Sequence, residues 1–232
     1  MSQLALDFGD RAALGADDFL VAPCNRDAVL WIDRWPAWPA PALVVHGPPG
    51  CGKTHLAHVW RARSGARMLA ADRLAHETPG ELIADTRCAV VERADATSGE
   101  QALVHLYNVV AERGGHLLLT ATAPPLQWGI ALPDLRSRIV AAPAVAIGAP
   151  DDALIAAVMG KLFGDRQLRV NDEVVGFLLA RMERSFDAAR RLVAALDSAA
   201  LAGARNITVP LARQVLDEFR DEWEGESPWT SE

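Results

Sequence analysis

The sequence predicts an α/β protein in which a five-stranded parallel sheet is followed by a small all-helical domain. Short apolar runs alternate with stretches of helical periodicity up to about residue 149, which is typical of a parallel sheet covered by helices on both faces. Beyond that position only helical periodicity remains. We therefore expect strands at residues 42–46, 67–71, 88–92, 116–121 and 145–147.

Helices are predicted from apolar periodicity and from residues that favour helix ends. The first helix has Asn25 at its N-cap position, and in the C-terminal part Asp151 and Asn171 can act as caps. Pro210 suits the first turn of the last helix, where its missing N–H has no intrahelical acceptor to lose. The expected helices are 26–35, 54–63, 100–113, a short one near 134–139, 151–163, 171–182, 185–203 and 210–223.

These patterns divide the chain into four segments. Residues 1–18 form an N-terminal tail, and residues 19–149 form the α/β domain. A helical domain of residues 150–223 follows, and residues 224–232 form a short acidic tail. The Gly-Ala-Pro sequence at 148–150 marks the boundary between the two domains.

Composition narrows the classes of function that the chain can have. Half of the 232 residues are hydrophobic, which excludes extensive disorder, and the net charge of −7 argues against DNA binding through a broad basic surface. The three cysteines have neither metal-site nor disulfide spacing, which suits a reducing compartment. No apolar run approaches the ~20 residues of a membrane span, and the N-terminus lacks the pattern of a secretory signal. We therefore expect a cytoplasmic protein that makes no contact with membranes.

The sequence GPPGCGKT at residues 47–54 fits the phosphate-binding loop pattern G-x-x-x-x-G-K-[ST]. It lies directly after a predicted strand and before a predicted helix, which is the context that this loop requires. Glycines let the backbone turn its N–H groups toward phosphate oxygens, and the helix N-terminus adds partial positive charge. The sequence therefore predicts that ADP or ATP binds at Gly47, Pro48, Pro49, Gly50, Cys51, Gly52, Lys53, Thr54 and His55.

Two residues of this loop have specific predicted roles. Lys53 would reach the β- and γ-phosphates, and the Thr54 hydroxyl would take one position around Mg²⁺. The alternative is a glycine-rich turn with a surface lysine. The strand before the loop and the helix after it argue against that alternative.

An α/β phosphate-binding domain followed by a helical lid resembles the AAA+ family, and several segments resemble its DnaA/Hda branch. DnaA proteins continue into a helix-turn-helix domain for origin DNA, whereas this chain ends after the lid. The resemblance therefore implies an Hda-type negative regulator of replication initiation without sequence-specific DNA binding of its own, and it leaves a homo-oligomer open. The resemblance covers nearly the whole chain, through residues 19–21 with Asn25, GPPGCGKTHL at 47–56, LLLTATAPP at 117–125, DLRSRI at 134–139 and ITVPLARQVLDE at 207–218.

The predicted nucleotide site departs from the AAA+ pattern at the residues that would support hydrolysis. By resemblance, Glu92 takes the position of the acid linked to Mg²⁺, and Arg93 replaces the acid that would polarise water. Since a cation cannot act as a base, hydrolysis by the chain itself should be poor, unless the loop turns back and brings in Asp95. Thr122 stands at the sensor position, and Asp187 stands where a lid arginine contacts the phosphates. These two departures favour a bound diphosphate.

Arg138, within DLRSRI, is by resemblance the arginine finger that enters the nucleotide site of a neighbouring AAA+ subunit. A guanidinium supplied in trans stabilises the charge on the transferring phosphoryl group. The alternative is a solvated arginine on a short helix. The resemblance implies that the partner is DnaA, so that the chain would activate a partner ATPase rather than act as an efficient ATPase.

Four residues of the N-terminal tail, Gln3, Leu4, Leu6 and Phe8, resemble the peptide that binds the bacterial sliding clamp, the β subunit of DNA polymerase III. An extended peptide would use the glutamine as a polar anchor and the apolar side chains to fill a groove. Alternatively, the tail packs against the α/β domain as a staple or an edge strand. Two rival functions for the whole chain are an autonomous AAA+ ATPase of the helicase-loader type and a clamp-binding adaptor that binds no nucleotide.

Overall fold

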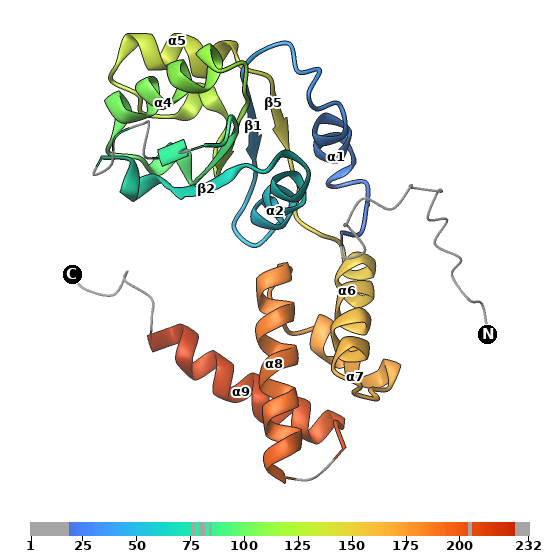
Figure 1. Cartoon of the computed structure of the whole chain (residues 1–232). Coiled ribbons are helices and arrows are strands. Elements are labelled where there is room, and N and C mark those ends of the chain that lie inside the picture. Colours follow the sequence, from blue (N-terminus) through green and yellow to red (C-terminus); the bar gives the residue numbers. More distant parts are fainter. Residues whose placement is uncertain (1–18, 76–77, 79–81, 84, 204–205, 226–232) are drawn as a thin grey trace. The chain divides into compact units, whose positions relative to one another are not determined.

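The computed structural model describes residues 19–75, 78, 82–83, 85–203 and 206–225 (Figure 1). The chain divides into two compact units, with the division between Gly148 and Ala149. The first unit contains a sheet and helices, and the described part of the second contains helices alone.

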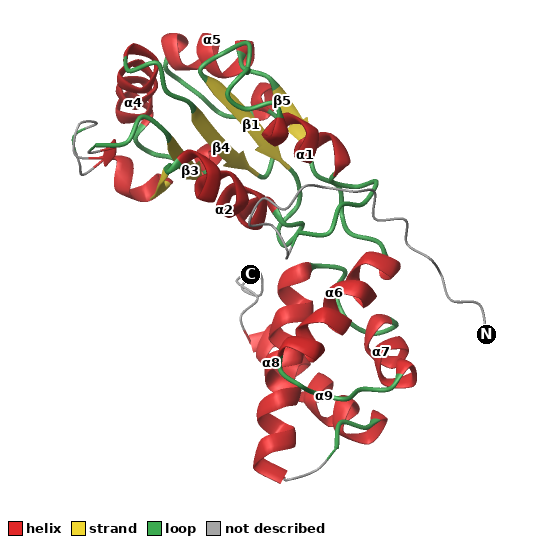
Figure 2. Cartoon of the chain, turned by 45° about the vertical axis from the view of Figure 1, so that its right-hand side comes forward, coloured by secondary structure: helices red, strands yellow, loops and turns green. Residues whose placement is uncertain are grey.

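The first unit confirms the predicted α/β fold with a five-stranded parallel sheet (Figure 2). The strands lie in the order β2-β3-β4-β1-β5, and every neighbouring pair is parallel. Because parallel strands run in one direction, their carboxyl ends lie at one edge of the sheet. The strands, each within one residue of its predicted bounds, are β1 (Ala42–His46), β2 (Arg67–Ala70), β3 (Ala89–Glu92), β4 (Leu117–Ala121) and β5 (Ala144–Ala146).

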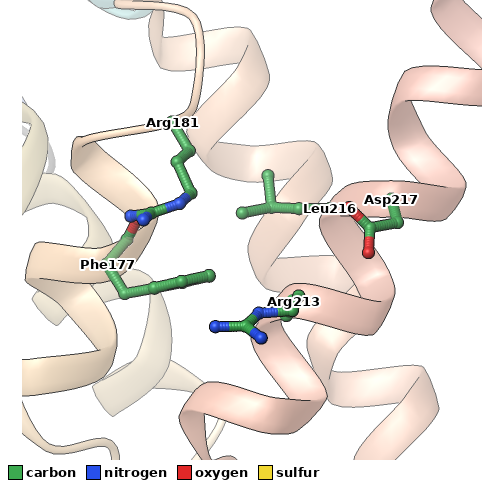
Figure 3. Close-up of a pocket in the computed structure, with 5 residues that line it drawn as sticks. All are labelled: Phe177, Arg181, Arg213, Leu216 and Asp217. Atoms are coloured by element: carbon green, nitrogen blue, oxygen red, sulfur yellow. The ribbon is translucent and has the colours of Figure 1, made fainter.

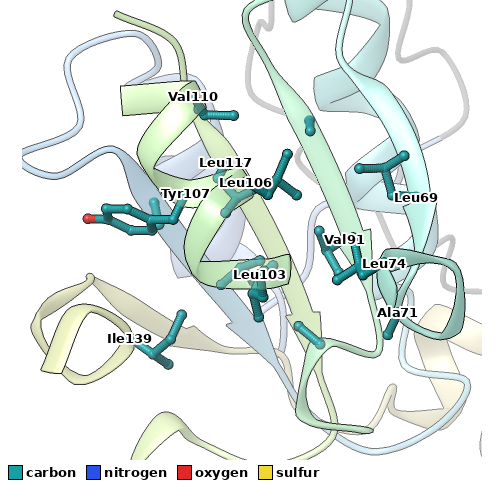
Figure 4. Close-up of a cluster of buried hydrophobic side chains, with 14 of the residues drawn as sticks. Leu69, Ala71, Leu74, Val91, Leu103, Leu106, Tyr107, Val110, Leu117 and Ile139 are labelled. Atoms are coloured by element: carbon teal, nitrogen blue, oxygen red, sulfur yellow. The ribbon is translucent and has the colours of Figure 1, made fainter. Parts of the chain in front are cut away.

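Among the described residues, the helices that cover the sheet are α1 (Arg26–Asp33), α2 (Lys53–Ser64), α4 (Glu100–Glu112) and α5 (Pro133–Ala141). Side chains of β1 alternate between the two faces, so that Leu43 and Val45 pack with α1 and α2. Ala42 and Val44 belong to the other core, which includes residues of α4 and α5 (Figure 4). Burial on both faces explains why the inner strands β1, β3 and β4 are apolar runs, whereas the edge strands β2 and β5 are partly exposed.

The second unit has its own hydrophobic core. Ile155, Leu178, Leu196 and Ala212, one from each of its helices, are completely buried in that core. Each of these helices therefore turns an apolar face toward the core. The helices are α6 (Asp152–Asp165), α7 (Asp172–Leu179), α8 (Phe186–Gly203) and α9 (Val209–Gly225), and Pro210 lies in the first turn of α9 as expected.

The three predicted N-caps have different outcomes. Asp151 accepts a hydrogen bond from a backbone N–H in the first turn of α6 at 2.8 Å, as predicted. Asn25 and Asn171 precede α1 and α7, but neither side chain bonds its helix, so the prediction of side-chain capping is wrong for both. The buried amide of Asn25 instead accepts from Ala22 N at 2.8 Å and donates to Leu20 O at 2.9 Å. The Asn25 amide therefore stabilises the conformation of the segment before the helix.

Short 3-10 helices that the sequence did not predict follow three of the strands. They change the direction of the chain close to the carboxyl ends of the strands. They are η1 (Ala71–Ala75), η2 (Ala94–Ala96) and η3 (Pro125–Gln127). Within the described ranges, no helix has the length and apolar character needed to cross a membrane.

Candidate functional site

The loop between β1 and α2 has a backbone that requires glycine at several positions. Gly50 and Gly52 have φ angles of 69° and 102°, which other residues rarely adopt. A Cβ atom on Gly47 would lie 2.1 Å from the carbonyl oxygen of Ile147, which follows β5. The Gly47 N–H also donates to the carbonyl of Ala121, at the end of β4, over 3.2 Å. The sheet edge therefore holds the start of the loop in place.

The N-terminus of α2 has the chemistry of an anion site. Gly52 occupies the N-cap position and has no side chain to pair with the N–H groups of the first turn. The described first turn contains no acidic residue, and the helix dipole adds partial positive charge there. Thr54 is exposed in this turn, and the ring of His55 packs edge-on against Phe19 at 5.3 Å. The phosphate groups of a nucleotide fit these groups.

The amine of Lys53 is held over the loop. Its Nζ donates to the carbonyl oxygens of Gly47 at 2.8 Å and Pro48 at 2.7 Å, and it lies 3.7 Å from the sulfur of Cys51. Burial, and secondarily the charge of Lys53, lowers the pKa of His46 at the end of β1. The loop itself therefore orients the lysine that the sequence predicts to bind phosphates.

The turn after β3 brings Asp95 against the end of β4. Its Oδ2 accepts hydrogen bonds from the backbone N–H groups of Thr122 at 2.7 Å and Ala123 at 3.3 Å, and from the Thr122 hydroxyl. Its Oδ1 is buried and has no partner among the described residues. The loop thus does turn back, but the carboxylate pairs with the predicted sensor residue. It holds the ends of two strands together.

The predicted Mg²⁺ ligands lie at the same edge of the sheet. Glu92 is the half-buried last residue of β3, and Thr54 follows β1 in the first turn of α2. Because β4 lies between β1 and β3, these residues do not come from adjacent strands. The part of the chain that the structure describes contains no cluster of three or more His, Cys, Asp or Glu suited to a metal. Coordination of Mg²⁺ by Thr54 and Glu92 remains a prediction.

Arg138 lies in α5, and each nitrogen of its guanidinium has a partner in this chain. Nε and Nη2 donate to the two carboxylate oxygens of Asp134 at 2.9 and 3.1 Å, and Nη1 donates to Asn108 Oδ1 at 2.6 Å. The guanidinium also lies over the Tyr107 ring, 5.3 Å from its centroid. The hydrogen bond to Asp134 raises the pKa of Arg138, so the group keeps its charge. Arg136 in the same helix is exposed and forms no ion pair with any described residue.

Comparison with known proteins finds a family match within the second unit and similar folds among solved structures. Residues 156–216 of the second unit match the family described as the lid domain of Hda. Domain III of the replication initiation protein DnaA from Thermotoga maritima is similar in structure, with a TM-score of 0.75 and 16% sequence identity. That similarity covers 87% of this chain and 95% of the solved one. The second unit therefore matches the Hda lid family over those residues, and the chain as a whole has the fold of DnaA domain III.

Other solved structures share the fold. A DnaA structure with bound AMPPCP and single-stranded DNA has a TM-score of 0.64 and 17% identity, over 89% of this chain and 68% of that one. The RuvB branch migration motor of Thermotoga maritima has a TM-score of 0.60 and 16% identity, over 76% of this chain and 61% of that one. At such identities the likeness shows the fold alone. An uncharacterized protein of Haemophilus influenzae is 29% identical over 119 residues, so the match spans about half of each chain, 51% of this one and 52% of its relative.

At the position that the resemblance assigns to a lid arginine, this chain carries an acid. Asp187 is exposed in the first turn of α8, with Arg190 Nη2 3.5 Å from its carboxylate. Arg184 binds the carboxylate of Asp152 at 2.6 and 3.1 Å, and this bond lowers the pKa of Asp152. The charges at the start of α8 are therefore largely paired within the second unit.

The second unit also has a hollow of about 270 Å³ between α7 and α9, which the sequence did not indicate (Figure 3). Phe177 lies between two guanidinium groups, with Arg181 at 4.1 Å and Arg213 at 5.7 Å from its ring centroid. Leu216 and Asp217 complete its lining. None of the predicted site residues lies here, and the cation–π contacts account for the arrangement.

The structure describes Arg138 but not the residues predicted to bind the clamp. The clamp-binding residues Gln3, Leu4, Leu6 and Phe8 lie outside the described residues. The contacts of Arg138 with Asn108 and Tyr107 were missed, because Asn108 is 30 residues away in the sequence. The spacing of Asp134 four residues before Arg138 was a signal that could have identified the ion pair.

Proposed function

We propose that this protein binds a nucleotide at the loop between β1 and α2 and stimulates ATP hydrolysis by DnaA, through Arg138 acting in trans. In this proposal Gln3, Leu4, Leu6 and Phe8 tether the protein to the DNA-loaded sliding clamp. The product, DnaA bound to ADP, would end the active state of the initiator. The protein is then a negative regulator of replication initiation rather than an efficient ATPase.

The observation that carries the proposal is a contrast between two parts of the site. The phosphate-binding loop is complete, but the end of β3 lacks an acid placed to activate water for hydrolysis. Gly47, Gly50, Gly52 and Lys53 have the conformations and contacts that suit phosphates. At the end of β3 a cation follows Glu92, and the carboxylate of Asp95 is bonded to backbone N–H groups. A general base is therefore lacking at the expected position. Nucleotide at such a site would support the fold, and catalysis would occur at a partner's ATP.

The geometry of Arg138 is compatible with action on a partner. Its side chain is 30% exposed, and a partly exposed ion pair such as that with Asp134 contributes only ~0.2–1 kcal/mol. A guanidinium forms stronger, charge-assisted and bidentate hydrogen bonds with phosphate oxygens. Exchange of Asp134 for a transferring phosphoryl group is therefore favourable. Until that exchange, Asp134 and Asn108 keep the guanidinium in a fixed orientation.

The experiment is a measurement of ATP hydrolysis by DnaA from the same source in the presence of DNA-loaded clamp. The wild-type chain should increase the rate, and Arg138→Ala should remove most of a finger contribution that is roughly 10³–10⁵-fold in well-studied systems. Arg136→Ala is the matched control, because it removes an exposed arginine from the same helix. Gln3→Ala should reduce stimulation in reactions that depend on DNA-loaded clamp, and it should have no effect in reactions that do not.

Two results would contradict the proposal in different ways. Equal loss of stimulation in Arg136→Ala and Arg138→Ala would mean that the charge of α5, and not a finger, matters. Absence of stimulation by a wild-type chain that still binds the clamp would leave a clamp-bound adaptor as the better account. Turnover by the chain alone that is lost in Lys53→Ala would instead favour an autonomous ATPase.

A further inference from the structure

Arg93 has an unusual backbone conformation at the end of β3. Its φ and ψ angles are 55° and 44°, in the left-handed region that residues other than glycine rarely adopt. Hydrogen bonds of both its backbone N–H and its carbonyl stabilise this conformation. The Arg93 N–H donates to the hydroxyl of Thr120, a buried residue of β4, at 3.1 Å, and the Arg93 carbonyl accepts from Ala96 N at 2.9 Å. Such retained strain is concentrated at functional sites.

The guanidinium of Arg93 has no counter-charge among the described residues. Its side chain is exposed, and no described carboxylate forms an ion pair with it. Asp95, two residues later, has its Oδ2 occupied by Thr122 and Ala123. By contrast, Arg138 and Arg184 each have a bidentate carboxylate partner. Arg93 is therefore a cation available to an anionic ligand.

The sheet places this cation at the same edge as the phosphate loop. His46 of β1 pairs with Ala121 of β4, and Val91 of β3 pairs with Leu119 of β4. Two residues beyond Val91, Arg93 is therefore at the level of Ala121, whose carbonyl binds the Gly47 N–H. Since β4 alone separates β3 from β1, the two strand ends are about 10 Å apart. A chain of phosphates that starts at the loop can extend across this distance.

We propose that Arg93 binds the terminal phosphate of ATP held at the loop. The inference rests on the nucleotide binding proposed above and specifies which residue recognises the third phosphate. A guanidinium presents a planar fork of donors that suits phosphate oxygens. Lys53 and the N-terminus of α2 would bind phosphates from the side of β1, and Arg93 would add a contact to the terminal phosphate from the side of β3. Because Arg93 cannot accept a proton from water, it would bind the triphosphate without promoting its hydrolysis.

The test is the affinity of the full chain for ATP and for ADP, measured by titration calorimetry with Mg²⁺ present. Arg93→Ala should weaken ATP binding about ten-fold and change ADP binding less than about two-fold, because the lost bond is to the third phosphate. Arg87→Ala is the matched control. It removes an exposed arginine just before the opposite end of β3 and should leave both affinities unchanged.

A second variant separates a role in binding from a role in folding. Arg93→Gly removes the guanidinium while allowing the left-handed backbone, so its thermal stability should equal or exceed that of the wild type. It should show the same selective loss of ATP affinity. Unchanged ATP affinity in this stable variant, or an equal loss for ADP and ATP, would overturn the inference.

Lys53→Ala distinguishes failure of the inference from failure of the proposed function. If the wild-type chain binds neither nucleotide, or if Lys53→Ala binds as well as the wild type, the proposed nucleotide site itself is wrong. If Lys53→Ala loses binding while both Arg93 variants behave as the wild type, the site stands. In that case only the role of Arg93 is contradicted.

Discussion

Replacing Gly47 by alanine would place a Cβ atom 2.1 Å from the carbonyl oxygen of Ile147 and 3.2 Å from the sulfur of Cys51. The oxygen belongs to the backbone and cannot move without shifting the segment after β5. We therefore expect Gly47→Ala to lower the free energy of unfolding by ~3 kcal/mol or more, as measured by urea denaturation.

Gly129 provides the control for this effect. A Cβ atom there meets no heavy atom within 4 Å, so Gly129→Ala should leave stability unchanged or raise it slightly. Similar losses in the two variants would show that the contact with Ile147 does not determine the cost.

His116 should make stability depend on pH. Its ring packs at right angles to Trp38 and nearly so to Trp35, at 5.3 and 6.2 Å, and burial lowers its pKa. The unfolded chain, with a histidine pKa near ~6.5, therefore takes up this proton first as the pH falls. The contribution of His116 is complete above the unfolded pKa and is lost as the pH falls toward the lower folded pKa.

The measurement is the free energy of unfolding between about pH 8 and pH 5 for the wild type and for His116→Phe, which keeps an aromatic ring. The variant should show a smaller decrease toward low pH. His46, whose pKa is also lowered, would retain its own share of the pH dependence. Identical slopes for both proteins would contradict the assignment to His116.

At the residue scale, the sequence indicates candidate residues where local spacing defines a motif, and it fails to indicate contacts whose partner is distant in the chain. The loop pattern identified Lys53 because the motif itself fixes the turn around it. It could not identify Asn108 as a partner of Arg138, since that contact depends on how α4 packs beside α5. The αL conformation of Arg93 was equally hidden, because the Thr120 hydroxyl that supports it comes from β4.

At the scale of elements, two helix N-termini of the second unit offer a matched comparison. Asp151 caps α6 through a bond to Leu154 N at 2.8 Å, whereas Asn171 precedes α7 without a side-chain cap. We expect Asp151→Ala to cost about 1 kcal/mol of stability, and Asn171→Ala to cost less than about 0.5 kcal/mol. Chemical denaturation of both variants checks the difference. Equal costs would mean that hydrogen bonding at the cap does not set the stability of α6.

The same elements show why the fold was predictable to a large extent. Every strand of the sheet lies within one residue of its predicted bounds. For the inner strands β1, β3 and β4 the reason is burial on both faces, which makes each of them an apolar run with clear ends. The 3-10 helices escaped prediction because so short an element has too few residues to display a period. Asn25 occupies the predicted N-cap position but makes no capping bond, because a short amide can equally well bond backwards, as it does to Ala22 and Leu20.

At the scale of the whole molecule, the hydrophobic cores are built from separate residues. The cores on the two faces of the sheet use residues of the first unit alone, and the core of the second unit uses none of them. Local unfolding should follow the same division, since residues that are buried in one common core tend to unfold together. A substitution that weakens the core of the second unit should therefore increase local unfolding in that unit and leave the first unit unchanged.

Leu196 and Leu201 of α8 make this testable, because the first is completely buried and the second is 74% exposed. Leu196→Ala should cost ~2–5 kcal/mol of local stability, whereas Leu201→Ala should cost less than about 0.5 kcal/mol. Amide hydrogen exchange should accelerate in α6, α8 and α9 of the first variant, while the amides of β1 and β4 keep wild-type rates. If the strands accelerate as much as the helices, the two units unfold together, and nucleotide bound at the loop would stabilise the lid as strongly as the sheet.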